Sequence, residues 1–182
     1  MHVVDFVILG AWVVFWIVWL AAAAGAKSDQ SRSSRYVGIR VGVVLLVLLL
    51  VRTRVLGSHA VTDNAWLEGI GLSIFLLGLA LAIWARVYLG RNWGMPMSKK
   101  QEPELVTTGP YHLIRHPIYS GIILGMIGTA IAVSVYWLIA VVLLAAYFAY
   151  SAVMEERLLA SEFPGSYPAY QKSSKRLIPF IY

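Results

Sequence analysis

Residues 117–154 form an unbroken run of 38 residues without a charged side chain, and this run sets the strongest limit on the fold of the 182-residue chain. An α-helix rises about 1.5 Å per residue, so a single helix over the run would be roughly 57 Å long. The hydrocarbon core of a bilayer is only about 30 Å thick. We therefore expect two antiparallel membrane-spanning helices, joined by a tight turn near Val133 and Ser134.

The composition of the whole chain agrees with a membrane protein. Hydrophobic residues make up 59% of it and charged residues 13%, and the mean hydropathy is +0.72. A soluble globular protein and a disordered chain are both excluded, since each needs more polar residues. Further apolar segments at residues 6–26, 36–56 and 69–85 are near the length that spans a bilayer. The predicted fold is an all-α integral membrane protein with five transmembrane helices, the last two forming a C-terminal helical hairpin.

The basic residues indicate how such a protein is oriented. The net charge is +6, and five spans place thirteen of the fifteen Lys and Arg residues on one side, against Arg52 and Arg54 on the other. Basic loops favour the cytosol, so the N-terminus is expected outside and the C-terminus inside. Charges confined to one membrane face need no nucleic acid as a partner. The first span is expected to be retained rather than cleaved as a signal peptide, because residues 1–5 carry no Lys or Arg.

Polar side chains gather at the two ends of the predicted hairpin. Arg115, His116 and Tyr119 stand at its entrance, and Glu155 and Glu156 stand at its exit. Antiparallel helices pack about 8–10 Å apart, so these side chains can meet at one membrane depth. Acidic residues at a helix C-terminus oppose the helix dipole, which suggests a cationic partner for the two glutamates.

A metal site is not expected. The chain has no cysteine. Pro117 favours the first turn of a helix and disfavours helical geometry in the residue before it, so a helix should begin at Pro117. His112 and His116 then cannot form a metal-binding pair one turn apart on a continuous helix.

The N-terminal spans carry features of helix packing. Trp12, Trp16 and Trp19 recur at helical spacing, which favours packing or lipid contact over a ligand site. The pairs Gly38 and Gly42, and Gly121 and Gly125, are small residues four apart that allow helices to approach closely. Both glycine pairs are expected to serve helix packing.

Five short stretches in the second half resemble one known family. They occur in order, as LGRNW at 89–93, LVTTGPY at 105–111, RHPIYSG at 115–121, EERLL at 155–159 and YPAY at 167–170. This pattern resembles the isoprenylcysteine carboxyl methyltransferase family of integral membrane methyltransferases, and more distantly the phospholipid methyltransferases. The resemblance divides the chain into three N-terminal transmembrane helices, residues 1–85, and a catalytic region, residues 86–182.

The resemblance implies S-adenosylmethionine as the methyl donor, bound at the cytosolic ends of the last two helices. By this resemblance the cofactor pocket is formed by Val106, Thr107, Gly109, Pro110, Tyr111, His116, Tyr119 and Glu155. The implied catalytic residues are Arg115, Glu155 and Glu156, and the roles of the two glutamates stay open. A glutamate can bind the donor's ammonium group, and aromatic rings favour its sulfonium cation.

The acceptor also stays open. It is expected to be a lipophilic or membrane-permeant compound, and the resemblance favours a carboxylate such as an isoprenylcysteine-like group. Arg115 could then orient that carboxylate through two hydrogen bonds. A phospholipid amine or a thiol would need a base, for which a glutamate is the obvious choice. The alternatives are an NADPH-dependent, sterol-reductase-like membrane enzyme and a non-catalytic membrane scaffold or transporter. No charge lies inside the hairpin, which disfavours a transport path.

Overall fold

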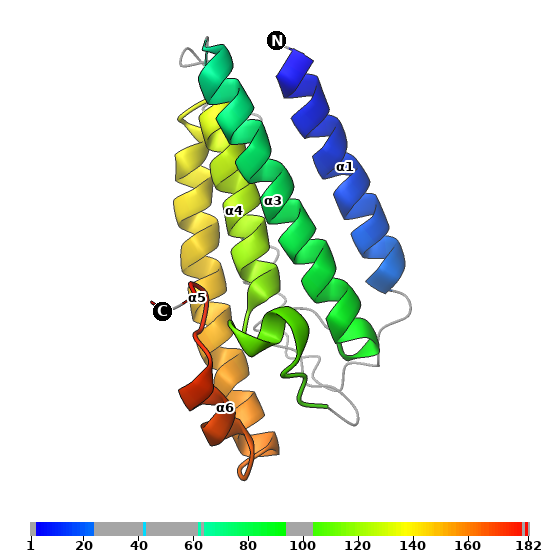
Figure 1. The fold of residues 1–182 in the computed structure, drawn as a ribbon, viewed down its shortest axis with the longest axis vertical. Helices are drawn as coiled ribbons and strands as arrows, with labels where there is room; N and C mark the ends of the chain where they lie inside the picture. The colour runs from blue at the N-terminus through cyan, green and yellow to red at the C-terminus, as the bar shows by residue number, and fades with distance from the viewer. Residues whose placement is uncertain are drawn as a thin grey trace.

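The computed structural model describes residues 3–23, 42, 62, 64–93, 104–179 and 181. These residues form a bundle of long helices, with short helical turns gathered at one end (Figure 1). The long helices are α1 (Val3–Ala23), α3 (Ala65–Leu89), α4 (Pro117–Ala132) and α5 (Trp137–Glu162). The short elements are η1 (Gly90–Asn92), η2 (Gly109–His112) and α6 (Tyr167–Ser173). Within the described ranges there is no strand, and Ile114 and Lys175 form an isolated parallel bridge.

The predicted hairpin is confirmed. Helices α4 and α5 lie side by side, and the chain reverses over residues 133–136, at the position expected (Figure 1). Among the described helices, α1, α3 and α5 are long and apolar enough to span a membrane, while α4 is shorter, with 16 residues. The predicted span at residues 36–56 lies outside the described residues except for Gly42, so the count of five spans stays a prediction.

Helices α3 and α4 approach until their backbones touch. A Cβ atom added to Gly78 would lie 2.3 Å from the backbone nitrogen of Gly125, and one added to Gly121 would lie 2.6 Å from that of Ala82. No side chain fits between these segments, so glycine is required at both positions. The close approach predicted for Gly121 and Gly125 is confirmed, whereas Gly38 lies outside the described residues.

Helix α1 packs on this pair through its tryptophans. The indole nitrogen of Trp12 donates a hydrogen bond to Thr129 Oγ1 at 3.1 Å, and its ring lies 5.5 Å from that of Phe75. Trp19 is buried, while Trp16 remains 43% exposed on the outer surface. The tryptophans therefore serve helix packing and the exposed surface, as expected.

Helix α5 corrects one expectation. It continues past the apolar run to Glu162, so Glu155 and Glu156 lie about two turns inside the helix and not at its C-terminus. The argument from the helix dipole was therefore wrong. The apolar run ends at Met154, but the same helix continues for eight more residues, and α6 packs against α5.

Candidate functional site at the ends of the hairpin

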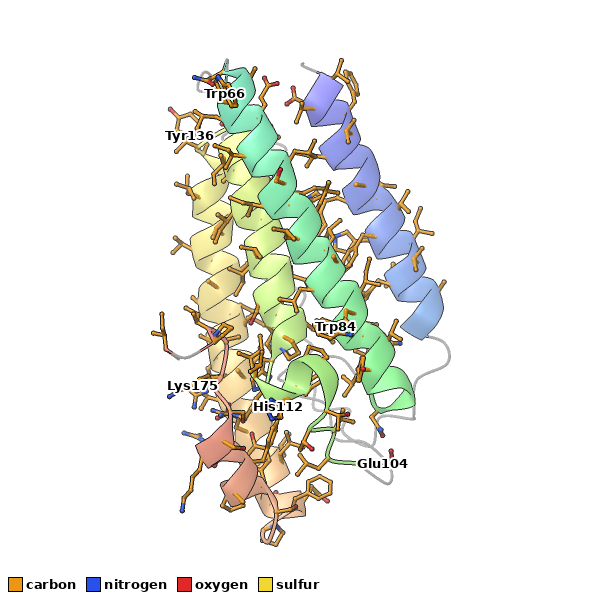
Figure 2. All side chains as sticks on the ribbon, in the orientation of Figure 1. Trp66, Trp84, Glu104, His112, Tyr136 and Lys175 are labelled. Atoms are coloured by element: carbon orange, nitrogen blue, oxygen red, sulfur yellow. The ribbon has the colours of Figure 1, made fainter. Side chains whose placement is uncertain are left out.

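The segment before α4 brings the first site residues to the hairpin entrance. His116 has φ −125° and ψ 57°, which is not helical, and Pro117 begins α4, as predicted. His112 belongs to η2, so the two histidines do not share a helix. Figure 2 shows His112 and Lys175 toward the same end of the bundle, far from Trp66 and Tyr136 at the other end.

A C-terminal strap, defined here as residues 174–179, pairs with this segment. Arg115 N donates to Lys175 O at 2.7 Å, His116 N donates to Arg176 O at 3.1 Å, and Lys175 N donates to Leu113 O at 3.0 Å. These bonds align the strap parallel to the chain that enters α4. The strap thus becomes part of the site, although it is distant in sequence.

Glu156 is the centre of the polar cluster. Its carboxylate accepts hydrogen bonds from Arg115 Nε at 2.9 Å, from Arg176 Nε at 3.0 Å and from Arg176 Nη2 at 2.8 Å. The residue is only 4% exposed. A buried carboxylate bound by two guanidinium groups is fully engaged, so Glu156 holds α5, the α4 entrance and the strap together.

Arg115 also binds the end of α6. Its Nη1 donates to Gln171 O at 3.2 Å and to the backbone oxygen of Ser174. Gln171 belongs to the last turn of α6 and Ser174 follows directly after it, so Arg115 satisfies free acceptors at the C-terminal end of this helix. Among the described residues Arg115 Nη2 has no hydrogen-bond partner. One edge of this guanidinium is therefore available to a ligand.

Glu155 has a different environment from its neighbour. It accepts a hydrogen bond from Tyr119 Oη at 2.5 Å, and its Oε2 lies 3.5 Å from His116 Nδ1. Its side chain is 23% exposed, compared with 5% for Glu156. Of the two carboxylates, Glu155 is the one that a cation from outside can reach.

His116 lies between the two glutamates. Its Nε2 is 3.4 Å from Glu156 Oε1, and its other ring nitrogen faces Glu155. Burial alone would lower the pKa of His116, but the hydrogen bonds and charges of Glu155 and Glu156 outweigh burial and raise it. The protonated imidazolium is thus favoured at this position.

Tyr119 is brought into the cluster as predicted, but little of its ring is open. The ring is stacked with His116, at 5.4 Å between centroids, and with Phe148, at 4.4 Å. The residue is 8% exposed. The hydroxyl group of Tyr119 binds Glu155, whereas both faces of its ring are covered by other side chains.

The segment at residues 106–111 is held mainly by backbone geometry. Gly109 has φ +59°, and a Cβ there would lie 2.4 Å from the ring of Tyr88, so only glycine fits. Pro110 and Tyr111 are buried, and Val106 packs partly against the core. Tyr111 O accepts a hydrogen bond at 2.6 Å from Tyr170 of α6. Burial raises the pKa of Tyr170 to about 12, which keeps its hydroxyl a donor.

A pocket of about 280 Å³ lies between this segment and α6. It is lined by Thr107, His112, Ala169, Tyr170 and Ser173. Of the predicted cofactor residues, only Thr107 lines it. Thr107 therefore lies in the wall of this pocket, whereas Arg115, His116, Tyr119 and Glu155 lie in the ionic cluster around Glu156.

Sequence reasoning missed several residues of the cluster. Arg176 entered only as a basic residue of the tail, and Tyr167 only as part of a motif. Tyr167 is completely buried, and its hydroxyl group has no hydrogen-bond partner among the described residues. The sequence signal that could have identified these two residues was the tyrosine shortly after the apolar run, with an arginine nine residues later.

Comparison with known proteins decides the family. The family model described as "Phospholipid methyltransferase" matches residues 67–165, which is more than half of the chain. The chain belongs to the phospholipid methyltransferase family. The match covers most of α3, all of α4 and α5, and the cluster residues between Arg115 and Glu156, while α6 and the strap lie beyond it.

Individual relatives extend this family assignment. The cobalt-zinc-cadmium resistance protein CzcN of Cupriavidus metallidurans is 34% identical over 143 residues, covering 77% of this chain and 63% of that protein. Protein-S-isoprenylcysteine O-methyltransferase B of Arabidopsis thaliana is 25% identical over 167 residues, covering 89% and 85%. The chain therefore spans less than two thirds of the length of CzcN.

A solved structure agrees with the fold. The eukaryotic intramembrane Ras methyltransferase, an isoprenylcysteine carboxyl methyltransferase, matches 83% of this chain and 54% of its own, with a TM-score of 0.58 and 27% identity. The resemblance to this family found in the sequence is confirmed. The chain is a multi-pass integral membrane protein of the same helical fold.

Proposed function

We propose that this protein is an S-adenosylmethionine-dependent membrane methyltransferase whose acceptor is a lipophilic or membrane-permeant compound. The observation that carries the proposal is the meeting of Arg115, His116, Tyr119 and Glu155 around the buried carboxylate of Glu156. Residues 86–182 would be the catalytic region. The basic side of the protein, with this cluster and the C-terminus, would face the cytosol.

The residues present fit this cofactor. When bound, S-adenosylmethionine supplies a methyl group on a sulfonium cation. Glu155 would hold the donor's ammonium group, since it is the more exposed carboxylate of the pair. The pocket beside Thr107 and Tyr170 is near the lower size limit of small-ligand sites, so it would take the nucleoside. The unpartnered hydroxyl group of Tyr167 leaves a buried donor for a polar ligand.

The environments of the two glutamates separate their roles. Glu156 would act as a positioning residue, because its oxygens already bind two arginines. Arg115 would bind the acceptor through Nη2, while its other nitrogens keep the guanidinium in place. Holding the two reacting groups in line is the main contribution that such a site can make to methyl transfer.

These contacts favour a carboxylate acceptor, such as an isoprenylcysteine-like compound. A carboxylate needs no base before it accepts a methyl group, and Arg115 offers it a cationic donor. An amine or thiol acceptor would need a free base. Glu155 is already held by Tyr119 and His116, and Glu156 is held by Arg115 and Arg176, so neither is well suited to that task.

The alternatives receive less support. The family match favours methyl transfer over the NADPH-dependent reductase and over a scaffold. The name of CzcN refers to metal resistance, but the described part of the chain has no group of three His, Cys, Asp or Glu residues that could hold a metal ion. We therefore do not extend metal binding to this protein.

The test is methyl transfer by the full chain in lipid vesicles. Methyl-labelled S-adenosylmethionine would be supplied with one acceptor class at a time: a prenylated cysteine, a fatty acid, a phospholipid amine or a thiol. We expect label in the prenylated cysteine or another lipophilic carboxylate. Labelling of only the amine or thiol would overturn the carboxylate assignment.

Binding measurements on the same preparation test the cofactor. We expect S-adenosylmethionine to bind and NADPH not to bind. The variant Glu155→Gln should lose donor binding, while Glu162→Gln, the same change about two turns along α5, should retain it. Binding of NADPH without S-adenosylmethionine would reverse the proposal.

A further inference from the structure

The strap returns from α6 toward the membrane. Its hydrogen bonds with residues 113–116 are parallel, so it runs in the direction in which the chain enters α4. Beyond them, Ser120 Oγ donates to Leu177 O at 2.6 Å. Ser120 lies three residues inside α4, roughly 4.5 Å along the helix axis from Pro117. Leu177 is therefore at the level where the apolar part of the hairpin begins.

The residues that follow present apolar side chains outward. Ile178 is 50% exposed and Ile181 is 76% exposed, and a turn joins them, with Ile181 N donating to Ile178 O at 3.2 Å. Leu113, on the neighbouring segment, is also exposed, at 49%. Ile178 and Ile181 follow Leu177 and so come after the level where the apolar part of the hairpin begins, while Leu113, whose carbonyl group pairs with Lys175, lies nearer the water side.

The side chains on the water side of this patch are basic. Lys172 on α6 and Lys175 at the start of the strap are exposed, and neither forms an ion pair with any described residue. Apolar side chains with lysines just outside them are the arrangement that binds the surface of an anionic bilayer.

We propose that the C-terminal segment at residues 172–181 binds the membrane surface on the side of the site. Ile178 and Ile181 would insert into the edge of the leaflet, and Lys172 and Lys175 would bind anionic lipid head groups. Along the strap Lys175 and Ile178 point outward, while Arg176 between them reaches Glu156. Attachment to lipid would therefore also hold Arg176 in the site.

The absence of cysteine from the sequence allows a direct test. Single-cysteine variants Ile178→Cys and Ile181→Cys would each carry one environment-sensitive fluorophore in the full chain, reconstituted into vesicles. Val142→Cys, on the exposed apolar surface of α5, is the control for lipid contact. Ser161→Cys, exposed near the end of α5 outside the apolar run, is the control for water.

We expect the fluorescence emission of labels at 178 and 181 to be blue-shifted, as for the label at 142. A lipid-attached quencher should reduce this emission, and iodide in the water should not. The label at 161 should show the reverse. If the labels at both 178 and 181 behave like the one at 161, the proposed insertion is wrong.

The two lysines are tested by lipid composition. Each lysine near an anionic surface should strengthen attachment by about fivefold. Lys172→Glu with Lys175→Glu should therefore increase iodide access at 178 in vesicles containing phosphatidylglycerol, and leave it unchanged in pure phosphatidylcholine. Equal access in both vesicle types, for the native and altered chains alike, would overturn the head-group contact. Neither readout depends on methyl transfer.

Discussion

Arg176 binds both carboxylate oxygens of Glu156, with Nε 3.0 Å from Oε1 and Nη2 2.8 Å from Oε2. This two-point contact joins the strap to α5 across 20 residues of sequence. Because Arg115 binds the same carboxylate from the α4 entrance, three separate parts of the chain meet at one side chain. The strap is therefore a structural component of the site.

Replacing Arg176 with lysine tests this contact. Lysine keeps the charge but cannot bind both oxygens in one plane, so we expect a loss of about 1–3 kcal/mol in the free energy of unfolding. Methyl transfer should fall by at least about tenfold, because the strap loosens. Thermal unfolding in detergent and the transfer assay measure the two effects. Arg157→Lys, the same change at an exposed position of α5, should alter neither.

Replacing each of the two glutamates with glutamine should have a different effect. Glu156→Gln leaves two partly buried arginines without their carboxylate, which should cost up to about 3 kcal/mol of stability. Glu155→Gln removes a more exposed charge, so the protein should lose about 1 kcal/mol or less and yet lose its affinity for S-adenosylmethionine. Thermal unfolding and calorimetric titration distinguish them. Equal destabilisation by both changes would contradict the assigned roles.

The α3–α4 contact predicts a sharp difference between two glycines. Gly121→Ala places a methyl group 2.6 Å from the backbone of Ala82, so the helices must separate, at a cost of about 1–3 kcal/mol or more. Gly69→Ala, on α3 with nothing within 4 Å, should be stabilising by up to about 1 kcal/mol. Unfolding temperatures of the two variants give the comparison, and similar values would contradict the backbone contact.

His116 predicts how stability depends on pH. Its pKa is raised above the ordinary 6.5 by Glu155 and Glu156, so folding favours the protonated form. This stabilisation is fully present below pH 6.5, the value in the unfolded chain, and disappears as the pH rises through the folded-state pKa. His116→Gln should make the unfolding temperature depend less on pH above the ordinary pKa of 6.5. An unchanged dependence on pH would exclude His116 as its source.

Tyr167→Phe removes a buried hydroxyl group that has no described partner. Without ligand, the free energy of unfolding of the variant should equal that of the native protein or exceed it by at most about 3 kcal/mol. If the hydroxyl serves a bound ligand, affinity for S-adenosylmethionine should decrease in the same variant. Thermal unfolding with and without the donor checks both parts, and a destabilised ligand-free variant would contradict this interpretation.

The sequence predicted those parts of the site that depend on hydropathy and local geometry. The length of the uncharged run predicted the hairpin turn. The turn itself then predicted that Arg115, His116 and Tyr119 lie close to Glu155 and Glu156. Pro117 predicted where α4 begins, because proline restricts the residue before it. Small residues four apart predicted the close approach of α4 to its neighbour.

Other parts depend on contacts that leave no periodic signal. The extension of α5 to Glu162 was missed, because hydropathy marks where a membrane ends and not where a helix ends. The role of Arg176 depends on backbone pairing between the strap and residues 113–116, which are about sixty residues away. Neighbouring helix residues point about 100° apart, so one glutamate turns inward and the other outward, and sequence order alone does not say which.

The contact of α3 and α4 has a consequence for motion. Where two backbones touch, no side chain can change rotamer to let one helix slide past the other. The α3–α4 pair then behaves as a rigid wall. If the site opens, as the proposed function would need, we expect the opening on the opposite side, where α5, α6 and the strap are joined by side chains that can separate and re-form.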